Sequence, residues 1–231
     1  MSHQITYGRE TITYELQFAE RKTVDIAVAP DRRVTVTAPL AADGERVAKL
    51  VRKRAAWILK QQRFFLGFEP RTPPRKYVGG ETHLYLGHQY RLKIFAAEEP
   101  SVKLRGGYFY VGTPDRSATK DMLHHWYAAR AAVKFPEIAT PYLARFAELG
   151  YVPKDLVIRS MQRRWGSCTA KGKLILNTDL VRAPRGCIEY VIVHELCHLA
   201  HHNHGKKFQA LQAREFPAWA KWKGVLEERM V

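Results

Sequence analysis

Cysteine is scarce in this chain of 231 residues, with three copies at Cys168, Cys187 and Cys197. The number is odd and no C-x-x-C pair occurs, which excludes the disulfide framework of small secreted domains. No segment approaches the roughly 18 uninterrupted apolar residues of a membrane span. The N-terminal stretch MSHQITYGRETITYEL also lacks the apolar core of a signal peptide. We therefore predict a cytoplasmic protein with reduced thiols and no membrane partner.

Acidic residues are also in short supply. Asp and Glu number 22 against 38 Lys and Arg, which gives a formal net charge of +16. The excess is +7 in residues 1–115 and +9 in residues 116–231, so it does not come from a detachable basic tail. Such a positive field attracts an anionic substrate or a nucleic-acid-associated protein, and it also serves solubility alone. The sequence sets no oligomeric state.

Internal repeats and low-complexity tracts are absent as well, whereas 46% of the residues are hydrophobic, as in globular proteins. Alternating β-branched runs such as ITYEL, TVDIAVA and RVTVTAP predict strands in the first forty residues. Residues 44–65, GERVAKLVRKRAAWILKQQRFF, predict one basic helix. Antiparallel strands with glycine turns are expected from there to residue 115. We divide the chain into a β-rich region, 1–115, and a second region, 116–231.

The second region is mainly helical by its pattern. KDMLHHWYAARAAVKFPEIATPYLARFAELG predicts two helices, because Pro136 and Pro141 interrupt the periodic run. Two strands are expected near LVIRSM and KLILNTDLV, with a hairpin turn at Lys171 and Gly172 between them. A further helix begins near Pro184, and one or two helices close the chain. The sequence therefore predicts an α+β fold.

The stretch VIVHELCHLAHHNHGKKF, residues 191–208, contains five of the ten histidines. Its HELCH segment matches H-E-x-x-H, which places His194 and His198 one turn apart on the same face of a helix. One ion can then bind a nitrogen from each ring. Glu195 lies about 100° around the helix, where it is suited to accept a proton from a metal-activated water rather than to bind the metal. This pattern predicts a catalytic metal site.

A third ligand is needed, and several residues compete for the position. His201 and His202 continue the helix, where each turn rises about 5.4 Å, so His202 stands too far from the ion unless the helix ends early. His204 lies beside Asn203 and Gly205, which stop helices. A turn there brings His204 back to the metal. We therefore rank His204 first, then Glu215 from a following helix, then His201 or His202.

Zinc is the metal that this donor set favours, because nitrogen ligands with one open position suit it. Another divalent transition metal is also compatible with the donors. Cys197 lies between the histidines in sequence, but on a helix it points about 100° away from His198. We interpret it as a packed thiol.

The segment RRWGSCTAKGKLILNTDLVRAPRGCIEYVIVHELCHLAHHNHGKKF resembles the YgjP-like metallopeptidase family. The family's features are an R-W-G-S-C segment, an Asn-bearing strand, and H-E-L-x-H-L with a further histidine. ERKTVDIAVAPDRRVTVTAP and GGETHLYLGHQYRLKI extend the likeness upstream, so it covers nearly the whole chain. The resemblance implies a zincin-like catalytic part, related to SprT-like proteases, with the HExxH helix packed on a small sheet. It also implies His194, His198 and His204 as metal ligands and Glu195 as the base.

The RWGSC segment offers candidate substrate-binding residues. Arg163 and Arg164 are suited to bind an anionic group or to stabilise charge in the transition state. Trp165 is expected either to shape the floor of a cleft or to pack in the core. Asn177 is expected either to present its amide to the substrate or to hold a turn.

Three functions compete at this point. The first is a zinc metallopeptidase with Glu195 as general base. The second is a metal-dependent nucleoside triphosphate pyrophosphatase of the UTP type, an activity also associated with the family, in which Arg163, Arg164 and Lys171 hold phosphates. The third is a basic nucleic-acid-associated protein with a structural zinc, although structural sites use four protein ligands. The H-E-x-x-H motif favours the peptidase. The charge favours the pyrophosphatase, or a protease that acts on nucleic-acid-bound proteins.

Overall fold

The computed structural model describes residues 2–29, 31–66, 75–162 and 164–230, with side chains as far as residue 228. The chain divides into two compact units, Met1–Pro73 and Pro74–Val231, which are described separately. Strands dominate the start of the chain and helices its end, so the predicted α+β class is confirmed. Among the described residues, no helix combines the length and the apolar character that crossing a membrane requires.

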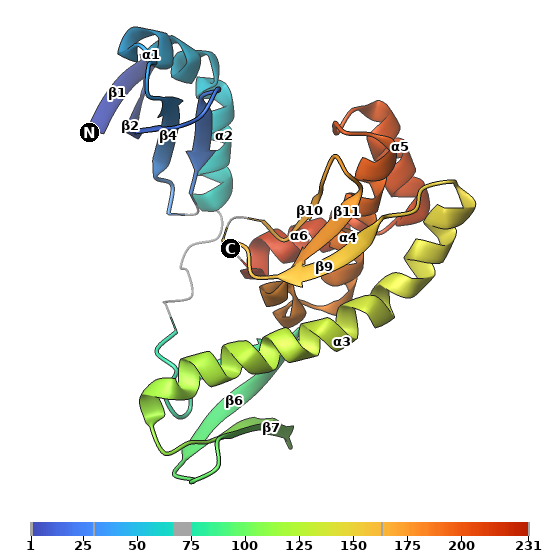
Figure 1. Ribbon diagram of the computed structural model, residues 1–231. Coiled ribbons are helices and arrows are strands. Elements are labelled where there is room, and N and C mark those ends of the chain that lie inside the picture. The colour runs from blue at the N-terminus through green and yellow to red at the C-terminus, as the bar shows by residue number, and fades with distance from the viewer. Residues whose placement is uncertain (1, 30, 67–74, 163, 231) are drawn as a thin grey trace. The chain divides into compact units, whose positions relative to one another are not determined.

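The first unit is a four-stranded sheet packed against two short helices (Figure 1). Alternate residues of β2 and β4 are buried, and they pack against Val47, Val51 and Ile58 of the helices. The single basic helix that we predicted at 44–65 is two helices, which divide at Arg54. The elements are β1 Ser2–Tyr7, β2 Glu10–Ala19, β3 Asp25–Val28, β4 Val34–Pro39, α1 Gly44–Lys53 and α2 Ala55–Leu66.

The sheet at the start of the second unit repeats the topology of the first. Its strand order is β5-β6-β8-β7, and that of the first unit is β1-β2-β4-β3. Each sheet joins two antiparallel hairpins through a parallel central pair, β2 with β4 and β6 with β8. The antiparallel strands expected after residue 65 are confirmed within each hairpin. The parallel central pair was not predicted, and it forms because the second hairpin returns its last strand to the centre. The strands are β5 Thr82–Tyr85, β6 His88–Phe95, β7 Ser101–Arg105 and β8 Tyr108–Gly112.

A single long helix, α3 Thr119–Glu148, follows the short 3₁₀ turn η1 Arg116–Ala118. The prediction that Pro136 and Pro141 divide it into two helices is wrong, because the helix continues through both and curves toward its C-terminal end (Figure 1). A proline inside a helix costs about 3 kcal/mol. Buried residues on both sides of the prolines, from Phe135 to Phe146, pack in the core and offset that cost.

The last part of the chain places the motif helix on a small sheet, as predicted. The strand order is β10-β11-β9, so β10 lies at an edge, and the turn expected at Lys171 and Gly172 is confirmed with Gly172 at φ 78°. α4 packs against β10 and β11 and against both following helices. The elements are β9 Asp155–Arg159, β10 Gly166–Cys168, β11 Lys173–Asn177, η2 Thr178–Arg182, α4 Arg185–Ala200, α5 Lys206–Glu215 and α6 Trp219–Met230.

The boundary between the compact units lies at Pro73 and Pro74, before the change from strands to helices near residue 115. The reason is that the sheet of β5 to β8 packs with α3 and η2, and α3 also contacts β9 and α4. The division into functional regions, 1–115 and 116–231, stays a prediction.

Candidate metal centre

The end of α4 decides which histidine joins His194 and His198. The helix ends at Ala200, and His201 follows it in an extended conformation with φ −139°. The chain thus leaves the helix before the turn that we predicted around Asn203. His204 returns to the motif before α5 begins at Lys206.

The imidazoles of His194, His198 and His204 converge, with one candidate ligand atom from each within 4.8 Å of the others. The Nε2 atoms of His194 and His204 are 3.0 Å apart. Two nitrogens bound to one tetrahedral zinc ion are about 3.3 Å apart, given bonds of about 2.0–2.1 Å. The ring of Phe208 packs against all three histidines, with centroid distances of 5.0, 4.8 and 4.7 Å. The spacing therefore fits a divalent metal.

Hydrogen bonds fix the protonation of two of the rings. His194 Nδ1 lies 2.9 Å from Oε1 of Gln212, and His198 Nδ1 lies 3.1 Å from the carbonyl oxygen of His201. Both oxygens can only accept, so each Nδ1 carries the hydrogen and each Nε2 keeps its lone pair. Burial lowers the pKa of His194 to about 4, and burial also lowers the pKa of His198. Both rings are thus neutral at pH 7, as metal ligands must be.

The other residues that the sequence offered as ligands lie outside this group. Within the described part of the chain, the candidate metal-binding group consists of the three histidines alone. Glu215 pairs instead with Arg145 at 3.1 Å. His201 contributes its carbonyl rather than its ring, and the side chain of His202 is exposed. Cys197 is fully buried in the core, in agreement with its interpretation as a packed thiol.

Glu195 is the buried carboxylate of the site, with 7% of its surface exposed. Burial raises its pKa to about 7, while the backbone N–H of Cys168 and the positive charge of Arg164 act in the opposite direction. Gly166 leaves room for it, because a Cβ at that position would lie 2.7 Å from Cγ of Glu195. The backbone of β10 therefore borders the carboxylate directly.

Within the part of the chain that the structure describes, the outer edge of β10 pairs with no other strand, and it borders Glu195. Across to the neighbouring strand β11, the carbonyl of Trp165 accepts from the N–H of Asn177, and the N–H of Thr169 donates to the carbonyl of Lys173. In an antiparallel pair these positions alternate, so the backbone groups of Gly166 and Cys168 point away from β11. The N–H of Cys168 donates to Glu195. The N–H and C=O of Gly166 are directed at the open edge.

A pocket of about 170 Å³ adjoins Glu195 between α4, α6 and β10. Lys223 and Glu227 of α6 form an ion pair of 3.6 Å there. Trp165 both borders the pocket and packs against the core, so it combines the two roles that the sequence left open. The lining residues are Trp165, Gly166, Tyr190, Val191, His194, Glu195, Lys223, Leu226 and Glu227.

The remaining candidate substrate residues differ in their placement. Arg163 lies outside the described residues, and the side chain of Arg164 is exposed. Asn177 is 4% exposed, and its Nδ2 donates to the carbonyls of Met161 and Arg164 at 2.7 and 2.8 Å. Its Oδ1 accepts from the N–H groups of Met161 and Asp179. Both amide hydrogens are used, so the structure favours the turn-holding role of Asn177 over contact with substrate.

Two residues of α5 that support the histidines were missed by the sequence reasoning. Phe208 packs under the three rings, and Gln212 accepts the hydrogen of His194. They are four residues apart, so they share a face of the helix. The only sequence signal is that spacing in FQALQ, directly after the histidine cluster.

Comparison with known proteins gives one positive result. No curated protein and no solved structure matches the chain. A family model described as a YgjP-like metallopeptidase domain matches residues 22–229. That range includes the three histidines, Glu195 and β10, and it covers nearly the whole sequence. The chain therefore belongs to the YgjP-like metallopeptidase family, which together with the three-histidine site supports a metal-dependent hydrolase.

Proposed function

We propose that this protein is a zinc-dependent peptidase in which Glu195 is the general base. The observation that carries the proposal is the position of a buried carboxylate beside both the three histidines and the open edge of β10. A hydrolytic site needs a base, an electrophile and a place for the substrate. Glu195 would be the base, an ion held by the three histidines would be the electrophile, and the edge of β10 would receive the substrate.

Zinc suits the donor set of three imidazole nitrogens, although another divalent transition metal is also compatible with it. His194, His198 and His204 would hold the ion, with Gln212 and the carbonyl of His201 fixing two of the rings. The chemistry that a bound zinc supplies is Lewis acidity, which polarises a carbonyl and lowers the pKa of water. Three ligands leave a position open, whereas a structural zinc uses four, so this donor set disfavours the structural alternative.

Glu195 would take a proton from the attacking water and pass it to the leaving amine. A group whose pKa lies near the working pH can both accept and donate a proton. Burial raises the pKa of Glu195 to about 7. The Cys168 N–H holds the carboxylate in place.

A peptide is the substrate that the surroundings favour. The backbone groups of Gly166 directed at the free edge can pair with an extended chain, as in strand addition. The adjoining pocket of about 170 Å³ is smaller than the roughly 300 Å³ at which small-molecule sites begin, and it suits a single side chain. Because Trp165, Val191 and Leu226 line it, we expect the side chain next to the scissile bond to be apolar.

The net charge of +16 and the positive charge of Arg164 acting on Glu195 favour the pyrophosphatase hypothesis. Lys171, the other predicted phosphate ligand within the described residues, is exposed on the turn between β10 and β11. The candidate metal group contains no carboxylate in the described residues, whereas magnesium-dependent phosphate chemistry relies on oxygen ligands.

The deciding experiment compares two substrates with two proteins. Wild type and Glu195→Gln, each loaded with zinc, are incubated with unfolded casein and separately with UTP. We expect casein fragments from wild type alone and an equal zinc content in both proteins. If wild type leaves casein intact but releases pyrophosphate from UTP, and Glu195→Gln does not, the protein is a pyrophosphatase instead. Equal activity of metal-free and zinc-loaded wild type would exclude both enzymes.

A further inference from the structure

Charge in the first unit is segregated between its strands and its helices. Residues 2–45 contain five basic and seven acidic side chains, a net charge of −2. Residues 46–66, here called the basic helical segment, contain seven basic and no acidic side chains. They are Arg46, Lys49, Arg52, Lys53, Arg54, Lys60 and Arg63. A chain that needs charge only for solubility gains nothing from this separation, because mixed charges serve solubility equally well.

Within the described residues, these basic side chains make no specific contact that stabilises the fold. All seven are exposed, and no ion pair or side-chain hydrogen bond involves them in that part of the chain. The folding of the two helices rests on other residues, because Val47, Val51, Ala55 and Ile58 are fully buried against the sheet. The segment therefore carries a charge of +7, and core packing alone fixes the position of its two helices.

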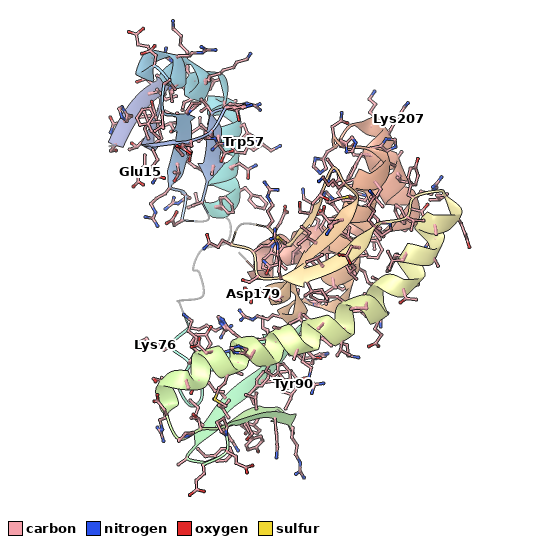
Figure 2. The ribbon with its side chains drawn as sticks, viewed as in Figure 1. Glu15, Trp57, Lys76, Tyr90, Asp179 and Lys207 are labelled. Carbon is pink, nitrogen blue, oxygen red and sulfur yellow. The ribbon has the colours of Figure 1, made fainter. Side chains whose placement is uncertain are left out.

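An exposed aromatic residue lies within the same segment. Trp57 of α2, labelled in Figure 2, has 40% of its surface exposed. Indole rings at such positions stack with unpaired bases, and neighbouring cations bind the phosphates between them. The residues Val47, Val51, Ala55 and Ile58 face the core. Among the described residues of these helices, Leu50, Trp57 and Leu66 are the exposed large apolar side chains, fewer than the wide apolar face that binds a lipid surface.

We propose that the basic helical segment binds single-stranded nucleic acid, with its Lys and Arg side chains on the phosphates and Trp57 stacked on a base. The proposal involves other residues than the proposed hydrolysis, since the segment belongs to the first unit and the three histidines belong to the second. Part of the excess positive charge of the chain is then assigned to one segment, with a nucleic acid as its partner. Binding is expected to depend on salt and to tolerate sequence changes.

The test uses the full chain and fluorescently labelled mixed-sequence 20-mers of single-stranded DNA and RNA. Fluorescence anisotropy is recorded over a KCl series for wild type and for Arg46→Gln/Lys49→Gln/Lys53→Gln. Each phosphate contact contributes about 0.7 to the slope of log K against log salt, so the triple variant should lower that slope by about 2. Its Kd at 0.1 M KCl should rise at least about tenfold. Trp57→Ala should raise Kd at least about fivefold.

A matched control carries the same charge change on exposed residues of the second unit, Arg91→Gln/Lys103→Gln/Arg105→Gln. It should bind like wild type, as should Glu195→Gln, which separates this proposal from the proposed function. Circular dichroism checks the folding of every variant. Equal losses in both triple variants, absence of oligonucleotide binding by wild type, or binding only to anionic phosphatidylserine vesicles would each overturn the proposal. The DNA and RNA arms identify the nucleic acid.

Discussion

Gln212 offers a sharp test of the metal centre, because it acts on a proposed ligand without touching the ion. It is 3% exposed on α5 and accepts the Nδ1 hydrogen of His194 at 2.9 Å. Gln212→Leu keeps the volume and removes the acceptor. A metal-bound ring cannot turn to find another acceptor, whereas a free ring can, so the cost falls mainly on the metal-bound state. Loss of such a partner typically weakens binding by about 10- to 100-fold, or about 1.4–2.7 kcal/mol.

The assay is competition for zinc against a chromophoric chelator at pH 7. Gln209→Leu is the matched control on the same helix, because Gln209 donates to the carbonyl of His204 and not to an imidazole. We expect the control to stay within about threefold of wild type, since its contact lies on the backbone. A folded Gln212→Leu protein that binds zinc within about twofold of wild type would refute this reasoning. A control variant that loses as much affinity as Gln212→Leu would refute it too.

Three further predictions concern the site and its unit. His204→Ala should lose bound zinc while His202→Ala keeps it, measured as metal content after gel filtration; retention by the first would remove His204 from the ligand set. Gly166→Ala should keep zinc but lose about 10- to 100-fold in kcat on a peptide substrate, because its Cβ would displace Glu195, and unchanged kcat would argue against a catalytic role for that contact. Burial lowers the pKa of His83 from 6.5 to about 4, so the unfolded chain binds an extra proton and stability falls as pH drops below 6.5. Between pH 7 and 5, wild type should lose up to about 2 kcal/mol more than His83→Gln in urea titrations followed by tryptophan fluorescence, and equal losses would contradict this.

The local parts of the site could be predicted from the sequence because they depend on helix geometry. The spacing of His194 and His198 follows from 3.6 residues per turn. The return of His204 follows from a helix that cannot continue through Asn203 and Gly205, although α4 in fact ends at Ala200. Alternating runs likewise predicted the strands of the first unit, since a half-buried strand alternates its faces.

Other features depend on contacts between segments far apart in the chain. The acceptor for His194 comes from 18 residues away, and the pocket beside Glu195 needs α6 to pack on α4. No periodic pattern records such contacts, because a pattern specifies which face is buried and not what buries it. The parallel pairing of the central strands could not be predicted from the sequence for the same reason.

The prolines were wrongly predicted to divide a helix, whereas the sequence left two roles open for Asn177. Proline lowers the stability of any helix locally, yet the buried face of α3 holds Pro136 and Pro141 inside one helix. Asn177 has an amide suited to a substrate, but the loop around Met161 uses all of its hydrogens. The sequence by itself thus determined the functional groups of the site, which are the histidines and the carboxylate of one helical motif. Only the tertiary structure decided which groups meet that motif, because packing free energy is summed over distant segments and overrides local preference.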